Sequence, residues 1–248
     1  MRTRKPGPMK LHLLTLAATA ATALMASSAN AAVTSAFFDP LAWGLNAGET
    51  VITQFEGRTL GTVAFNQPGY GLSGSAQLFT GSVGGVSAAP AVPNTASVFD
   101  GSGHDGSQYL SIQGGQTATL TLAAGGLREI SFYIGSIDTY NTLAFHYADG
   151  TSELPVMTGQ WVANHTITQS NGNQQSGNTN GRLTLTFDKA IDRVVLGSSQ
   201  NAFEISEVAG ISAGVPEPAS WALMILGFGG AGAALRAQRR RQPAATCA

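Results

Sequence analysis

The sequence predicts an all-β protein body, folded as a β-sandwich with jelly-roll topology. About eight to ten short segments alternate apolar and polar side chains, as half-buried strands do, and Gly-, Asn- and Asp-rich turns separate them. Only 11% of the residues are charged and 31 are glycine, which favours an extracellular β type over a cytosolic enzyme. No helical periodicity of useful length is present between residues 60 and 211.

The first third of the body has the least regular pattern. Between residues 32 and 60, four apolar residues indicate either an edge strand or a surface patch: Phe37, Phe38, Leu41 and Trp43. Residues 62–66 (TVAFN) have high β-propensity. Residues 69–96 are rich in Gly, Ser, Ala and Pro, so we expect them to form a surface loop.

From residue 107 onward the alternation is regular. Strands are expected over residues 107–113, 117–123, 127–137, 141–151, 161–169, 181–189, 193–199 and 202–211. The expected inward-facing rows are Leu110 and Ile112; Ala118, Leu120 and Leu122, or their Thr neighbours; Ile130, Phe132 and Ile134; and Leu143, Phe145 and Tyr147. Gly pairs and Asp149-Gly150 supply the turns.

The body is acidic, because most basic residues gather at the two ends of the chain. Residues 32–215 contain 13 acidic and five basic residues, so their formal charge is −8, although the whole chain has −1. A nucleic-acid partner is not expected, since phosphate binding needs clustered Lys and Arg. The one cysteine is Cys247, so core packing and not a disulfide must stabilise the body.

Residues 1–31 have the three parts of a secretory signal peptide. Four basic residues precede an apolar run over residues 11–25: Arg2, Arg4, Lys5 and Lys10. Ala29 and Ala31 then match an A-x-A cleavage site, which would leave Ala32 as the new N-terminus. The alternative is an uncleaved membrane anchor, but the apolar run is short for a spanning helix.

Residues 214–242 form a second tripartite signal, which a tail at 243–248 follows. Pro216, Glu217 and Pro218 precede an apolar run from Ala219 to Leu235. This run is near the lower limit for a single membrane-spanning helix. Four arginines follow the run and would keep this end in the cytoplasm, which places the body at 32–213 outside: Arg236, Arg239, Arg240 and Arg241.

The order and spacing of this tail resemble the PEP-CTERM sorting signal of the PEPxxWA type, since Trp221 and Ala222 follow the Pro-Glu-Pro motif. The resemblance implies recognition by an exosortase of a Gram-negative exopolysaccharide producer, with Pro216, Glu217 and Pro218 as a substrate site. The expected partners are therefore the Sec machinery, signal peptidase and exosortase, with transient contact with the membrane. A plain C-terminal membrane anchor is the alternative.

The segments at residues 132–150 and 201–210 also resemble the carbohydrate-binding-module-like bodies that PEP-CTERM tails often accompany. The leading expectation is a non-enzymatic protein of the cell surface or extracellular matrix, working with exopolysaccharide or biofilm. A carbohydrate-binding module is the second hypothesis, and a secreted hydrolase is the third. The spacings typical of zinc sites and of a nucleophile elbow are missing, so we expect no catalytic residue.

Two kinds of site residue are expected in the body. Hard oxygen ligands for a structural Ca²⁺ would come from Glu204 and Glu207 in the last strand, or from Asp100 and Asp105 in a Gly-rich loop. No other cofactor is expected. Aromatic rings that stack on sugars would come from Tyr140 and Trp161, whereas Tyr133 and Tyr147 lie near expected core positions.

Overall fold

A computed structural model describes residues 32–62, 65–67, 69–122, 125–151, 156–214, 224–233 and 236. Strands dominate the described body, and their pairings are antiparallel. In chain order the elements are β1 (Val33–Pro40), β2 (Thr50–Thr53), β3 (Gly61–Thr62), β4 (Phe65–Gln67), β5 (Tyr70–Gly74), β6 (Gln77–Thr80), β7 (Gln108–Ile112), β8 (Thr117–Leu122), β9 (Leu127–Gly135), β10 (Asn141–Tyr147), β11 (Met157–Thr158), α1 (Gly159–His165), β12 (Gly181–Ser198) and β13 (Phe203–Ser212). The all-β prediction is confirmed.

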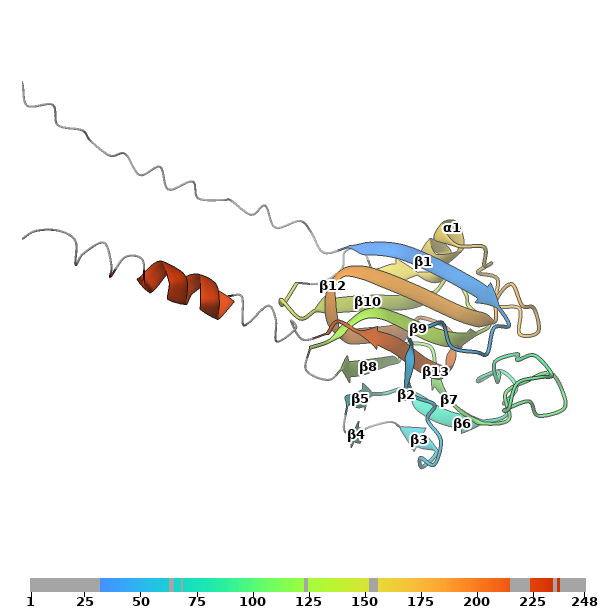
Figure 1. The fold of residues 1–248 in the computed structure, drawn as a ribbon. Helices are drawn as coiled ribbons and strands as arrows, with labels where there is room; N and C mark the ends of the chain where they lie inside the picture. Colours follow the sequence, from blue (N-terminus) through green and yellow to red (C-terminus); the bar gives the residue numbers. More distant parts are fainter. Residues whose placement is uncertain are drawn as a thin grey trace, which may run out of the picture. The chain divides into compact units, whose positions relative to one another are not determined.

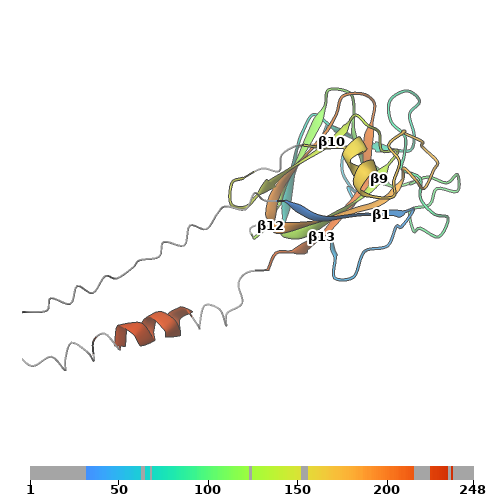
Figure 2. The same ribbon diagram turned by 90° about the horizontal axis from the view of Figure 1, so that it is seen from above.

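The described strands form one hydrogen-bonded sheet with the order β3-β6-β7-β13-β9-β12-β8-β5-β4. Strand β12 joins its two halves: residues 181–187 pair with β1 and β9, and residues 191–198 pair with β8 and β10. Figures 1 and 2 show that this sheet curls around the interior of the body. The finer prediction of a jelly-roll sandwich is not confirmed, because the strands belong to one continuous sheet.

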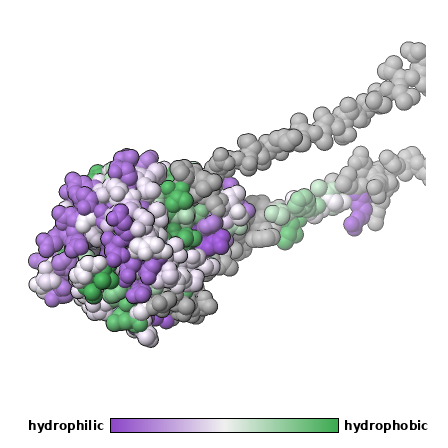
Figure 3. Space-filling view, turned by 180° about the vertical axis from the view of Figure 1, so that it is seen from behind, coloured by the Kyte–Doolittle hydropathy of each residue, from purple (hydrophilic) through white to green (hydrophobic). Residues whose placement is uncertain are grey.

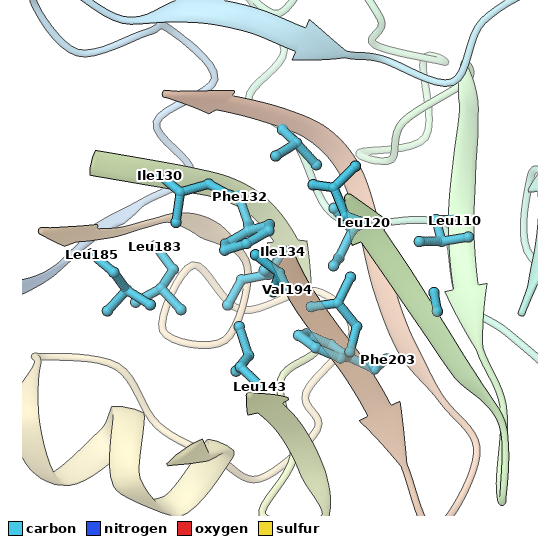
Figure 4. Close-up of a cluster of buried hydrophobic side chains, with 14 of the residues drawn as sticks. Leu110, Leu120, Ile130, Phe132, Ile134, Leu143, Leu183, Leu185, Val194 and Phe203 are labelled. Atoms are coloured by element: carbon cyan, nitrogen blue, oxygen red, sulfur yellow. The ribbon is translucent and has the colours of Figure 1, made fainter. Parts of the chain in front are cut away.

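Buried hydrophobic side chains from β7, β8, β9, β10, β12 and β13 form one core cluster, part of which is shown in Figure 4. The inward rows expected on four strands are buried, since an antiparallel strand turns every second side chain to the same face. They are Leu110 and Ile112; Ala118, Leu120 and Leu122; Ile130, Phe132 and Ile134; and Leu143, Phe145 and Tyr147. Tyr133 is buried as well, so both tyrosines placed near the core are interior. Apolar burial of this extent is the main stabilising contribution in a body without a disulfide.

The N-terminal ambiguity is resolved in favour of an edge strand. Strand β1 pairs with β12, with Phe38 fully buried and Phe37 more than half exposed. On the face shown in Figure 3, hydrophilic residues predominate over the body and apolar residues form only small patches.

One expected strand is a helix in the structure, and two other expected strands are continuous. Residues 161–169 were expected to be a strand, but α1 occupies Gly159–His165. The hydroxyl of Thr158 accepts a hydrogen bond from the Trp161 N–H at 3.1 Å, and this N-cap outweighs the alternating pattern that follows. The strands expected at 181–189 and 193–199 form the single strand β12.

The surface loop expected at residues 69–96 is largely structured. It contains β5 and β6, and its Ala-Pro part is buried, including Ala88, Ala89 and Ala91. Pro90 packs directly on Gly135, where an added Cβ would lie 2.8 Å from the proline Cγ. Small side chains therefore allow this segment to pack against β9, which composition alone does not reveal.

The described C-terminal segment is helical over residues 224–233, and its apolar side chains are exposed. Within the part of the chain that the structure describes, no helix reaches the length and apolarity needed to span a membrane. Arg236 is described and exposed.

Candidate functional site

A pocket of about 250 Å³ lies where the connections at one end of the sheet meet. Residues 82–88 follow β6, residues 136–140 join β9 to β10, and residues 201–202 join β12 to β13. A fourth segment, which precedes β12, contributes Gly172 and Gln174. The connections after β9 and β12 meet here because the end of β12 pairs with the start of β10, Ser198 opposite Asn141, and the start of β13 pairs with the end of β9, Glu204 opposite Gly135.

Glu204 of β13 is the most deeply buried ionisable group of the pocket, with 1% of its surface exposed. One carboxyl oxygen accepts the Ala88 N–H at 3.0 Å and faces the Ser87 hydroxyl at 3.3 Å. The other accepts the Ser136 hydroxyl at 2.8 Å. Burial raises the Glu204 pKa to about 7, although these hydrogen bonds act to lower it. The group is therefore partly protonated near neutral pH.

Asp138 and Tyr140 form the second polar group of the pocket. The Tyr140 hydroxyl lies 2.6 Å from an Asp138 carboxylate oxygen and 2.9 Å from the Asn201 carbonyl oxygen, and its single hydrogen serves one of them at a time. Burial raises the Asp138 pKa, and the hydrogen bond from Tyr140 opposes that rise. Gly172 fits closely against this carboxylate, since an added Cβ would lie 2.3 Å from Asp138 Oδ2.

A buried amide holds the pocket loops together. The Asn180 side-chain oxygen accepts the backbone N–H groups of Ala91 and Ser136, both at 3.0 Å. Its amide nitrogen donates to the carbonyls of Asn173 and Ser176, both at 2.9 Å. Ser136 has a φ of 38°, in the left-handed region that non-glycine residues rarely adopt. The Asn180 bonds offset this strain and hold the Ser136 hydroxyl on Glu204.

The described residues that line the pocket have hydroxyl, amide, carboxyl or small side chains, apart from the aliphatic Val83 and Val86, and none of them is basic. Hydroxyls and amides both donate and accept hydrogen bonds, whereas carboxylates only accept. The pocket can therefore bind a neutral ligand rich in hydroxyl groups, or a cation. It offers no countercharge to an anion.

The predicted calcium ligands have separate surroundings. Glu207 forms an ion pair with Arg182 at 2.5 Å, and Gln54 also donates to it at 2.5 Å, whereas Glu204 faces the pocket. Asp100 is exposed, and Asp105 is fully buried and accepts from Ser107. No group of three or more His, Cys, Asp or Glu side chains suited to a metal gathers among the described residues.

Structural Ca²⁺ stays a prediction, which thermal melting with and without EDTA tests. If EDTA leaves the melting temperature unchanged, that prediction fails.

The two predicted sugar-contact residues lie in different places. Tyr140 lines the pocket. Trp161 lies on α1, packs against the core and stacks on the His165 ring, with centroids 4.0 Å apart and 14° between the planes. Because His165 covers one face of its ring, Trp161 is a poorer platform for a sugar than the sequence suggested.

The residues of the two sorting signals fall mostly outside the described part of the chain. They are Ala29, Ala31, Pro216, Glu217, Pro218, Trp221, Ala222, Arg239, Arg240 and Arg241. The family model of the PEP-CTERM protein-sorting motif matches residues 214–241, which agrees to within one residue with the range of 214–242 expected from the sequence.

The chain carries a PEP-CTERM sorting motif. This motif identifies an exported protein that is targeted to an exosortase and delivered to the cell surface.

Comparisons outside the motif are weak. No curated protein matches the chain. A peptidoglycan O-acetylesterase is 14% identical with a TM-score of 0.33, covering 71% of this chain and 40% of its own. The catalytic unit of a GH87 α-1,3-glucanase from Streptomyces thermodiastaticus strain HF3-3 is 16% identical with a TM-score of 0.29, covering 62% and 28%. The PEP-CTERM protein thus spans less than half of either structure.

Sequence reasoning found Glu204 and Tyr140 but missed Ser136, Asp138 and Asn180. Asp138 and Ser136 follow a strong strand and stand two and four residues before Tyr140, so the cluster of polar residues in Ser136–Tyr140 was a readable signal. Asn180 ends a run of Asn, Gln, Ser and Gly that indicates only turns. Its burial depends on contacts with segments far away in the sequence.

Proposed function

We propose that the exported body of this PEP-CTERM protein binds a neutral polysaccharide at the cell surface and catalyses no reaction. The observation that carries the proposal is the pocket itself, lined by hydroxyl, amide and carboxyl groups without a basic side chain. Delivery to the surface would bring this pocket to the exopolysaccharide or biofilm matrix.

The size of the pocket limits what it can hold. About 250 Å³ is just below the range of roughly 300–1,000 Å³ found for drug-sized ligands. We therefore expect it to hold one sugar unit or one chain end, and not a long stretch of polymer. Tyr140 would contribute both a ring and a hydroxyl to such a contact.

Charge favours a neutral polysaccharide over a uronate-rich one. The pocket contains Asp138 and Glu204, and the whole body has a formal charge of −8. A carboxylated sugar would be placed beside like charges with no cation to compensate. Hydroxyl groups of a neutral sugar can instead donate to the remaining lone pairs of the half-buried Asp138 carboxylate.

Binding is favoured over catalysis because the protein already uses the carboxyl groups. Both oxygens of Glu204 accept hydrogen bonds from Ala88 or Ser136, and Tyr140 lies at hydrogen-bond distance from Asp138. A general acid must place its proton within hydrogen-bond reach of the leaving oxygen, and Glu204 is 1% exposed. The raised Glu204 pKa is nevertheless the one feature that favours the alternative, a secreted hydrolase.

The test uses the protein recovered from its host and the host's own polysaccharide, separated into neutral and uronate-rich fractions. We expect binding to the neutral fraction, with about a three- to tenfold loss in Tyr140→Ala, the order of one lost hydrogen bond between neutral groups. Asp149→Asn is the control, because it removes an exposed carboxylate outside the pocket.

Equal binding by wild type and Tyr140→Ala would refute the pocket as the site. Preference for the uronate-rich fraction would refute the charge argument. Release of reducing ends that stops in Glu204→Gln would establish the hydrolase instead.

A further inference from the structure

The start of strand β1 is held by an aspartate that lies far away in the sequence. The backbone nitrogen of Ala32 donates to Asp188 Oδ1 at 2.9 Å, in a partly buried contact between residues 156 positions apart. In return, the Asp188 N–H donates to the Ala32 carbonyl at 3.2 Å. One residue thus binds both the nitrogen and the carbonyl of Ala32.

Asp188 lies between the two halves of β12 that pair with different partners. The β1–β12 register runs from Val33 opposite Phe187 to Pro40 opposite Gly181, so Ala32 and Asp188 extend this ladder by one step. The Arg128 guanidinium donates to the Asp188 carbonyl at 2.5 Å and ties this part of β12 to β9. The Asp188 carboxylate is therefore held next to the nitrogen of Ala32.

That nitrogen is the atom that export would change. Cleavage after Ala31, as the A-x-A pattern predicts, adds water across the Ala31–Ala32 peptide bond. The carboxyl group leaves with the signal peptide, and the Ala32 amine takes up a proton to become an ammonium group. We propose that Asp188 is the docking site of the mature N-terminus, where its carboxylate binds the α-ammonium of Ala32 in an ion pair.

The site is specific for a chain that starts at Ala32. A longer N-terminus would leave an uncharged amide at this atom, and a start at Val33 would remove the atom altogether. The ion pair would fasten the free end of β1, an edge strand that would otherwise fray first. Cleavage adds a positive charge to this nitrogen, so the contact with the Asp188 carboxylate gains a Coulombic attraction that the uncharged amide lacks.

The composition of the mature chain provides a direct assay. The sequence has three lysines, and Lys5 and Lys10 lie in the signal peptide, so a chain that starts at Ala32 has only the α-amine and Lys189 to label. Intact mass of the protein recovered from the host gives the N-terminus. Labelling with an amine-reactive ester, followed by peptide mass analysis, then gives the rate at each amine.

We expect the mature chain to start at Ala32 and its α-amine to react several-fold more slowly in wild type than in Asp188→Asn, with the rate at Lys189 as the internal reference. Asp188→Asn should also lower the urea midpoint in low salt, and about 1 M NaCl should shrink the difference. Asp192→Asn, four residues further along β12, changes the charge equally and is the control.

Asp188→Glu keeps the carboxylate and should still slow the labelling of the α-amine in part. If Asp188→Asn folds poorly, this variant keeps the proposal testable. A mature chain that starts elsewhere would overturn the proposal. So would an α-amine that reacts equally fast in wild type, Asp188→Asn and Asp188→Glu. Neither outcome depends on whether the pocket binds polysaccharide.

Discussion

The buried Arg182–Glu207 ion pair is expected to be the most sensitive point of the fold. The two side chains are 1% and 3% exposed, and their charged atoms lie 2.5 Å apart. The guanidinium also donates to the carbonyls of Trp43 and Gly44 and to the Ser131 hydroxyl, at 2.8–2.9 Å. Arg182 thus joins the segment after β1 to β9, β12 and β13.

Arg182→Met keeps much of the side-chain volume but leaves the Glu207 carboxylate buried without a cation. It also removes the donor from two backbone carbonyls. Breaking a buried ion pair by removing one partner costs about 3–5 kcal/mol, because desolvation of the remaining charge is no longer compensated. We expect a loss of that size in the free energy of unfolding, a large fraction of the roughly 5–15 kcal/mol typical of a domain.

Equilibrium unfolding in urea measures this loss, with Glu207→Gln and the double variant completing a cycle. The double variant should lose less than the sum of the two single variants, since it leaves no unpaired charge. Lys189→Met is the control, because it breaks an exposed ion pair with Asp149 and should barely move the urea midpoint. A loss below about 1 kcal/mol in Arg182→Met, or strictly additive single variants, would refute the reasoning.

Three further predictions concern the pocket. Burial raises the Glu204 pKa from 4.5 to about 7, so the unfolded chain loses this proton at a lower pH than the folded protein does. As the pH rises between these two values, the free energy of unfolding should therefore fall by on the order of 3 kcal/mol. Urea unfolding at pH 5 and pH 8 should show a smaller fall in Glu204→Gln. Gly172→Ala should lower the urea midpoint more than Gly150→Ala, because both glycines have positive φ but only Gly172 would place a Cβ against Asp138. Asn180→Ala should cost about 2–4 kcal/mol in the same assay, since it leaves two buried N–H groups without an acceptor.

Each of these expectations has a contrary outcome. An unchanged pH slope in Glu204→Gln would mean that another group titrates in this range. Equal losses in Gly172→Ala and Gly150→Ala would mean that the Asp138 carboxylate moves aside freely. If Asn180→Ala resembles Asn164→Ala, at an exposed position on α1, the buried amide does not hold the loops together.

The strands that could be predicted are those whose side chains alternate strictly. In β10 the pattern of Leu143, Phe145 and Tyr147 is sufficient, since one face of the strand packs on the core and the other does not. Residues 161–169 alternate as well, but the Thr158 cap and the burial of Val162 produce α1 there. The secondary structure of such a short segment depends on its contacts with neighbouring residues more than on the alternation of its own side chains.

The candidate site could be predicted only in part, because its residues come from four connections. Tyr140 and Glu204 were found by residue type alone. Their meeting with Asp138 follows from the order of β9, β12 and β13 in the sheet, and sequence does not provide that order. Glu204 and Glu207, both predicted calcium ligands, have separate protein partners in the structure, since Glu207 binds Arg182 of β12 and Glu204 faces the pocket.

The sequence by itself determined that this protein is β-rich and acidic in its body and that it carries a PEP-CTERM sorting motif. These properties are local, because composition, alternation and linear motifs need no partner elsewhere in the chain. The tertiary structure alone decided the continuous curled sheet, the buried Ala-Pro segment, the pocket and the contact between Ala32 and Asp188. Each of these depends on residues distant in sequence, whose contacts form only when the strands pair and the core excludes water.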